Sequence, residues 1–139
     1  MIIDATDTIM GRVATVAAKK ALLGEKVDII NCEKAVVSGR KKWLLPETKR
    51  RKDMGIPTKG PVIYRMPDRF VRRAIRGMLP HKKPRGREAF KRIRCYIGVP
   101  LQFKDQKAEI IKEASFRKLP NLKYTTVKQI CKHLGGKVD

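Results

Sequence analysis

Four arginines between Pro67 and Gly77 have the residue type and the spacing of a phosphate-binding helix face. They recur at i, i+3, i+4 and i+7, which places side chains on one face of an α-helix: Arg69, Arg72, Arg73 and Arg76. A separate apolar stripe runs through the same stretch: Phe70, Val71, Ala74 and Ile75. Guanidinium groups bind phosphate oxygens in a bidentate manner and also stack on bases. No acidic residue follows any of these arginines at i+4, so we expect an external anion as their partner. The alternative is a basic face that is only solvated.

A basic turn follows this predicted helix, from Gly77 to Arg87. Backbone without bulky side chains can approach a phosphate closely, which favours glycine in such a turn. Five residues are predicted to shape the loop: Gly77, Met78, Leu79, Pro80 and Gly86. If Gly77 has a positive φ, Gly77→Val is predicted to misdirect the loop that follows. The alternative, which can hold at the same time, is that Gly77 caps the helix while Met78 and Leu79 anchor the turn in the core.

Patterns typical of nucleotide-dependent enzymes are absent from the sequence. A strand-helix-strand unit at the N-terminus would bind a dinucleotide if its first turn carried GxGxxG, but Gly11 is the only glycine there. Gly55 and Gly60 have the spacing of a P-loop, yet Pro61 and Val62 stand where lysine and Ser/Thr are required. We therefore expect no nucleotide cofactor.

Metal-binding and acid-base patterns are also absent. The two histidines, His81 and His133, lie outside any metal-ligand or triad-like motif. Three cysteines stand far apart in the sequence, form no CxxC pair and are expected to be buried or free thiols: Cys32, Cys95 and Cys131. The sequence therefore predicts a protein that is not an enzyme and that holds no metal.

Positive charge is concentrated in the middle of the chain. The 139 residues carry a net charge of +21, and residues 40–94 hold twenty Lys and Arg against four Asp and Glu, which accounts for +16 of that total. In the rest of the chain the numbers of basic and acidic residues are balanced as on an ordinary protein surface. A compact fold with so much like charge is expected to bind a polyanion, and its concentration in one section predicts a nucleic-acid-binding surface. Charge that merely solvates the surface is the alternative.

The elements that must position these side chains follow from hydrophobic patterning. Short apolar strands are predicted at residues 2–3 and 28–31, with a helix at 12–23 between them that ends at Gly24. A helix between two strands at this spacing predicts a right-handed crossover and a parallel sheet. Further apolar segments at 35–37 and 94–97 are enough for a small α/β sheet. Prolines and glycines in the middle section predict extended, turn-rich backbone interrupted by short helices.

The C-terminal part, residues 104–135, is predicted to be helical, with one helix around residues 106–114 and another at 125–134. The second presents an apolar face that packs on this domain or on a neighbouring protein: Val127, Ile130, Cys131 and Leu134. We expect a single domain over residues 1–139. Neither a signal peptide nor a membrane span is predicted.

Several motifs resemble those of the large ribosomal subunit protein 13 family in its archaeal type. They cover residues 2–100 in the order and spacing of the family, and the longest is Arg73-Ala74-Ile75-Arg76-Gly77-Met78-Leu79-Pro80. The others are Asp4-Ala5, Gly11-Arg12-Val13-Ala14, Asn31-Cys32-Glu33-Lys34-Ala35, Ser38-Gly39, Arg85-Gly86 and Tyr96-Ile97-Gly98-Val99-Pro100. Cys32 stands where the family has alanine, and the last third of the chain is less distinctive.

The resemblance implies a three-layer α/β/α fold around a small, mainly parallel sheet. It also implies a cytoplasmic constituent of the large ribosomal subunit that binds 23S-type ribosomal RNA directly, supports subunit assembly and translation, and has ribosomal proteins as neighbours. No membrane and no small-molecule substrate are expected. A free-standing RNA-binding protein and an RNA-modifying enzyme are the alternatives. The predicted RNA contacts are Arg12, Arg40, Lys41, Lys42, Lys49, Arg50, Arg51, Lys52, Lys59, Arg65, Arg69, Arg72, Arg73, Arg76, His81, Lys82, Lys83, Arg85, Arg87, Lys91 and Arg92.

Overall fold

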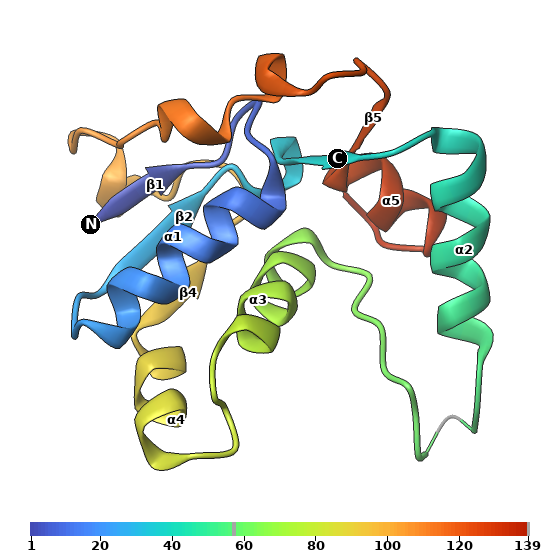
Figure 1. Cartoon of the computed structure of the whole chain (residues 1–139), viewed down its shortest axis with the longest axis horizontal. Helices are drawn as coiled ribbons and strands as arrows, with labels where there is room; N and C mark the ends of the chain where they lie inside the picture. Colours follow the sequence, from blue (N-terminus) through green and yellow to red (C-terminus); the bar gives the residue numbers. More distant parts are fainter. Residues whose placement is uncertain (57, 139) are drawn as a thin grey trace.

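Three short parallel strands form the central sheet. The computed structural model describes residues 1–56 and 58–138. The strands are β1 (Ile2–Asp4), β2 (Val27–Ile30) and β4 (Ile93–Cys95), in the order β1-β2-β4 (Figure 1). Ile3 pairs with Ile29, and Val27 pairs with Ile93. The predicted α/β class and the mainly parallel sheet are confirmed.

Helix α1 (Met10–Leu22) connects β1 to β2 and packs against the sheet and against α3 (Pro67–Met78). Its buried face is rich in alanine, which has no bulk beyond Cβ and so lets the helices approach closely: Val13, Ala14, Ala17, Ala18 and Ala21. Val71 and Ile75 of α3 enter the same core. Gly24 follows the end of α1 with φ +104°, a conformation that glycine adopts without strain. The predicted helix and its glycine stop are confirmed.

A second, two-stranded sheet lies apart from the central one. β3 (Val36–Ser38) pairs in antiparallel fashion with β5 (Tyr124–Thr126), which leads directly into α5 (Val127–His133). The apolar segment at 35–37 therefore forms a strand, but in this second sheet and not beside β1, β2 and β4. The predicted apolar face of α5 is buried within this chain: Val127, Ile130, Cys131 and Leu134.

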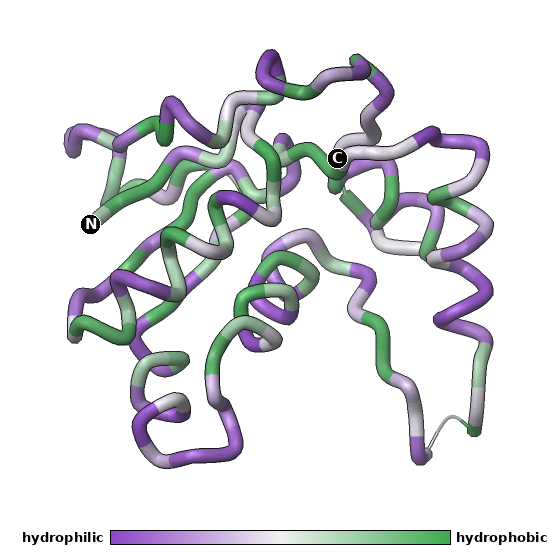
Figure 2. The backbone as a smooth tube through the Cα atoms, viewed as in Figure 1, coloured by the Kyte–Doolittle hydropathy of each residue, from purple (hydrophilic) through white to green (hydrophobic). Residues whose placement is uncertain are grey.

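The middle section is more helical than its prolines predicted. α2 (Lys41–Asp53) contains Pro46 in its interior, while Pro67 and Pro84 are the first residues of α3 and of α4 (Pro84–Lys91). The helix predicted from Pro67 is confirmed, but α2 and α4 stand where extended, turn-rich backbone was expected. In α4 the reason is that proline fits the first turn of a helix, where its missing N–H has no partner to lose. Among the described residues of this section, extended backbone lies mainly between α2 and α3. Figure 2 shows hydrophobic residues along β1 and β2 and hydrophilic residues in the loop before α4.

The predicted helix at 106–114 is also wrong. Residues 101–118 instead contain three short 3-10 turns: Leu101–Phe103, Lys112–Ala114 and Phe116–Lys118. The backbone of Glu109 pairs with the free edge of β1, donating to Ile2 O at 2.9 Å and accepting from Asp4 N at 3.0 Å. This pairing fixes the segment in an extended form and overrides its local helix propensity. None of the helices in the described ranges is long and apolar enough to cross a membrane.

Candidate nucleic-acid interface

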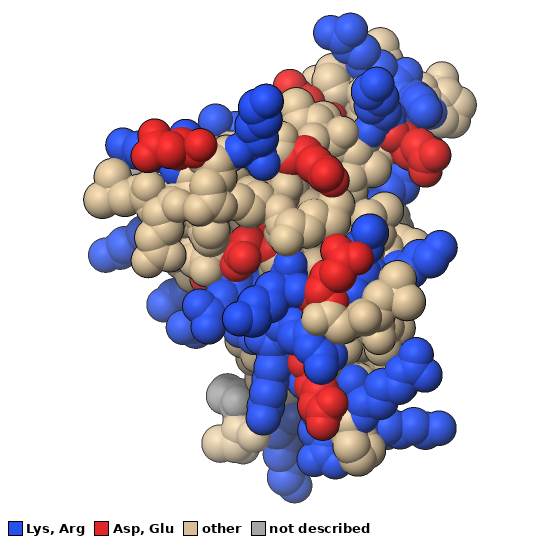
Figure 3. All heavy atoms as spheres, turned by 90° about the vertical axis from the view of Figure 1, so that its left-hand side faces the viewer, with Lys and Arg blue, Asp and Glu red and all other residues tan. Residues whose placement is uncertain are grey.

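The predicted RNA-contact residues are accessible from solvent. All are exposed except four, which are half-buried: Arg72, Arg76, His81 and Arg92. They come mainly from α2, α3, α4 and the connections between these helices. Figure 3 shows Lys and Arg gathered over the lower half of one face of the molecule, on the side of α3 and α4. The basic section is thus largely a helical surface, which holds its charges in fixed relative positions.

Helix α3 brings the four arginines into one pocket. Val71 and Ile75 are buried on its core face, at 1% and 0% exposure. A pocket of about 350 Å³ on its other side, hereafter the arginine pocket, is lined by Tyr64, Arg69, Arg72, Arg73, Arg76 and Phe90. Within the described part of the chain no acidic side chain lines it. The spacing prediction that these arginines share one side of the helix is confirmed.

Two arginines of the pocket have buried nitrogen atoms that bond to nothing. The Nε atoms of Arg72 and Arg76 are inaccessible to solvent and have no hydrogen-bond partner among the described residues. The guanidinium carbon of Arg72 lies over the ring of Phe90, 4.5 Å from its centroid. This cation-π contact holds one wall of the pocket in place. The pocket is therefore lined by positioned guanidinium groups, which can bind an anionic acceptor.

Several of the predicted RNA-contact residues form hydrogen bonds within the chain. Arg12 Nη1 donates to the backbone oxygen of Glu113 at 2.8 Å, and Lys52 Nζ donates to that of Leu134 at 2.9 Å. Arg92 donates to the backbone oxygen of Ala21 at 3.4 Å and lies 4.0 Å from Glu88. These contacts fasten neighbouring elements together, so the side chains serve the fold as well as the charge of the surface.

Glu47 partly neutralises the positive charge of α2. It accepts hydrogen bonds from both Arg50 and Arg51, with ion-pair distances of 2.8 Å. These two hydrogen bonds lower the pKa of Glu47 to about 2, so its carboxylate stays charged at neutral pH. Arg50 and Arg51 consequently offer less free charge to a polyanion than the arginines of α3.

The turn after α3 differs from the prediction at two of its residues. Gly77 lies inside α3 and has no positive φ, which removes the reason to expect that Gly77→Val misdirects the loop. Met78 is 45% exposed and does not anchor the turn, whereas Leu79 is buried at 4%. Pro80 is exposed and its carbonyl accepts from Lys83 N at 2.9 Å.

Gly86 lies where there is no room for a side chain. A Cβ at this position, within α4, would collide with the backbone carbonyl of Pro80 and reach the backbone nitrogen of His81. The absence of a side chain thus lets α4 pack directly on the turn that precedes it.

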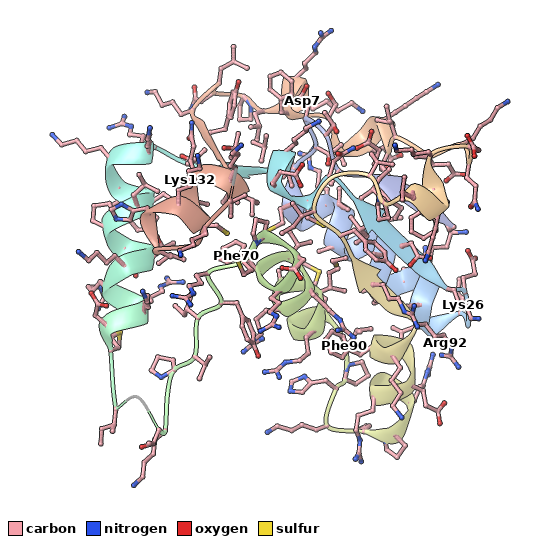
Figure 4. All side chains as sticks on the ribbon, turned by 180° about the vertical axis from the view of Figure 1, so that it is seen from behind. Asp7, Lys26, Phe70, Phe90, Arg92 and Lys132 are labelled. Carbon is pink, nitrogen blue, oxygen red and sulfur yellow. The ribbon has the colours of Figure 1, made fainter. Side chains whose placement is uncertain are left out.

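Sequence reasoning missed Tyr64 and Phe90. Each lies in the basic section next to a basic residue, Arg65 and Lys91, and aromatics interleaved with basic residues are a known signal of nucleic-acid binding. Figure 4 shows Phe90 between α3 and α4, and Phe70 at the other end of α3.

Metal-binding clusters are not seen among residues 1–56 and 58–138, where no three His, Cys, Asp or Glu side chains are grouped to hold an ion. The cysteines are free, and Cys32 and Cys131 are buried. A hydrogen bond with Cys95, together with burial, raises the pKa of Cys32, and burial raises the pKa of Cys131 to about 12.

Similarity to a known protein family extends over the whole of the basic section, residues 40–94. The sequence model of the family described as Ribosomal protein L13 matches residues 1–102 of the 139. This chain belongs to the ribosomal protein L13 family. The match includes the central sheet, α2, α3, α4 and every residue of the arginine pocket.

Archaeal members of the ribosomal protein L13 family align with nearly the whole chain. Large ribosomal subunit protein uL13 of Methanopyrus kandleri is 43% identical over 136 residues, covering 96% of this chain and 86% of that protein. The proteins of the same name from Haloarcula marismortui and Methanocaldococcus jannaschii are 43% and 42% identical. Both alignments cover 98% of this chain, and they cover 91% and 98% of the two relatives. The resemblance to the archaeal type is confirmed.

Proposed function

We propose that this protein binds large-subunit ribosomal RNA directly through its basic section and supports assembly of the subunit. As a member of the ribosomal protein L13 family it is a structural constituent of the large ribosomal subunit in the cytoplasm, and not an enzyme. The RNA contact and the assembly role are the proposed part. Residues 40–94, together with Arg12, supply the proposed contacts.

The single observation that supports direct RNA binding best is the gathering of four arginines in the arginine pocket. α3 is anchored in the core by Val71 and Ile75, so the arginines on its other side are held in register with the fold. In the described residues of this section only three basic side chains form ion pairs: Arg50, Arg51 and Arg92. The remaining positive charge has no internal counterpart, and phosphates of a folded RNA would supply one.

Specificity on folded RNA is expected to come mostly from shape. The wide minor groove and the backbone of A-form RNA are accessible to side chains, whereas its major groove is deep and narrow. A helical basic surface matches a pattern of phosphates at fixed distances and so sets the register of the protein on the RNA.

The test is filter binding of an archaeal large-subunit rRNA transcript across a salt series. Arg69, Arg72, Arg73 and Arg76 are changed together to alanine. Each phosphate contact that is lost should reduce the magnitude of the slope of log K against log salt by about 0.7–0.9. We expect weaker binding and a flatter slope, with a circular dichroism spectrum like that of the unaltered protein.

A matched control removes the same charge elsewhere. Lys104, Lys107, Lys112 and Lys118 are exposed and lie outside the basic section. Changing these four to alanine should leave the slope nearly unchanged. Equal effects of the two variants would mean that binding reports only net charge and would refute the assignment to the basic section.

The assembly role is tested by sedimentation. The protein should migrate with large subunits and remain there in moderate salt. Recovery of the protein only in fractions that contain no ribosomal subunits would contradict the assembly role and favour a free-standing RNA-binding protein.

A further inference from the structure

We propose that the arginine pocket holds one unpaired nucleotide of the ribosomal RNA, with its base stacked in the pocket and its phosphate bound by arginine. The inference rests on the proposed RNA-binding function and assigns to one site a specific class of ligand. The proposal gives this pocket a different role from the rest of the basic section, for which only phosphate contacts are proposed.

The pocket has the size and the flat walls that a base requires. Its volume of about 350 Å³ lies at the lower end of the range of about 300–1,000 Å³ for sites that hold small molecules. Tyr64 enters from the segment before α3, and Phe90 enters from α4. Both aromatic side chains are half-buried, so each is supported by the fold and still offers surface to the pocket.

Phosphate binding alone gives no role to the Tyr64 ring in the pocket. A phosphate is satisfied by guanidinium and backbone N–H groups and gains nothing from an aromatic ring. Bases, in contrast, stack on Tyr, Phe and the plane of an arginine. Because Arg72 lies over the Phe90 ring at 4.5 Å, Phe90 supports this guanidinium. An entering base would stack on Arg72 or on Tyr64.

The arginine side chains of the pocket also fit a nucleotide. Nε of Arg72 and Nε of Arg76 are both shielded from water and have no partner among the described residues. These two atoms cannot be reached from the open pocket, so an entering phosphate oxygen or base carbonyl would bind other nitrogen atoms of the arginines. Arg69 and Arg73 are exposed at the same pocket and are free to bind the flanking phosphates.

A paired RNA helix does not fit this arrangement as well as a single nucleotide. Bases within a duplex are stacked on their neighbours and cannot enter a concave site, whereas bases in loops and bulges can be splayed out. The proposed partner is therefore a nucleotide in a single-stranded loop or bulge of the rRNA.

The experiment uses variants that remove stacking and leave the charge unchanged. Tyr64→Leu and Phe90→Leu, singly and together, are compared with the unaltered protein by filter binding of the rRNA transcript in a salt series. Stacking contributes about 1–3 kcal/mol per base, which corresponds to a loss of affinity of about 5-fold to 150-fold. The slope of log K against log salt should stay the same, because no cation is removed.

Tyr64→Phe is the matched control. It keeps the ring and should bind like the unaltered protein, and circular dichroism verifies that each variant is folded. If Phe90→Leu does not fold, Tyr64→Leu alone still tests the inference. Base-specific chemical probing of the bound rRNA should show one unpaired nucleotide that is protected by the unaltered protein and by Tyr64→Phe, but exposed with Tyr64→Leu.

The outcomes separate this inference from the proposed function. Failure of the unaltered protein to bind the rRNA would overturn both. Salt-dependent binding by the unaltered protein, with equal affinity for Tyr64→Leu, would overturn the nucleotide pocket and leave direct RNA binding in place. Salt-dependent binding without protection of any unpaired nucleotide would likewise overturn the pocket.

Discussion

Two glycines nine residues apart, Gly77 and Gly86, should respond in opposite ways to the same substitution. Gly77 lies in α3 in ordinary helical conformation, and a Cβ there would meet only Arg73 Nη1, at 4.0 Å. Gly77→Ala should therefore raise the free energy of unfolding by about 0.5–1 kcal/mol, since alanine restricts the unfolded chain and favours the helix.

Gly86→Ala should lower the free energy of unfolding. The added Cβ would collide with the carbonyl of Pro80, which is backbone and cannot rotate away as a long side chain could. Pro80 O already accepts from Lys83 N, so a shift of the turn disturbs this bond as well. Overpacking of this kind costs about 1–3 kcal/mol, which exceeds the gain from helix propensity.

Urea unfolding followed by circular dichroism measures both effects. With an unchanged m value, the midpoint for Gly77→Ala should rise and the midpoint for Gly86→Ala should fall relative to the unaltered protein. Two midpoints that move in the same direction by the same amount would refute the reasoning, because they would show that space around the glycine does not decide the effect.

Two further predictions concern titratable groups. The pKa of Glu47 is lowered to about 2 from an ordinary value of 4.5, so its ion pairs stabilise α2 above about pH 4.5 and lose this effect as the pH falls towards 2. An acid titration of helicity should show a smaller change for Glu47→Gln than for the unaltered protein over that range; identical curves would contradict the pairing. Cys32 and Cys131 are buried with raised pKa values, so a thiol reagent at pH 8 should modify them only after unfolding, and rapid modification of the native protein would contradict their burial.

The parts of the fold that the sequence predicted correctly depend on local patterns. The strands at 2–3 and 28–31, the helix between them and the arginine face of α3 each follow from spacing within about ten residues. Pro67 was correctly interpreted as a helix start, whereas Pro84 was not, because proline indicates either an extended turn or a helix start and only the following residues decide between these. The helix expected at 106–114 failed for a different reason, namely that Glu109 pairs with Ile3 of β1, 106 residues earlier in the chain.

The arginine pocket could be predicted only in part. The four arginines share one helix, so their spacing was sufficient to bring them together. Tyr64 and Phe90 come from other segments and reach the pocket only because α3 and α4 fold onto the central sheet. No local pattern contains that information.

The hydrogen bond from Lys52 to the carbonyl of Leu134, the residue after α5, gives the C-terminal third of the chain a mechanical role. α2 has no buried residue of its own, yet it contacts both β5 and α5 and is tied to the carbonyl of Leu134 at 2.9 Å. A chain cut before β5 would keep all three strands of the parallel sheet but would lose the strand partner of β3 and the support of α2. The part of the sequence with the least distinctive motifs therefore determines the orientation of a basic helix some 80 residues earlier in the chain.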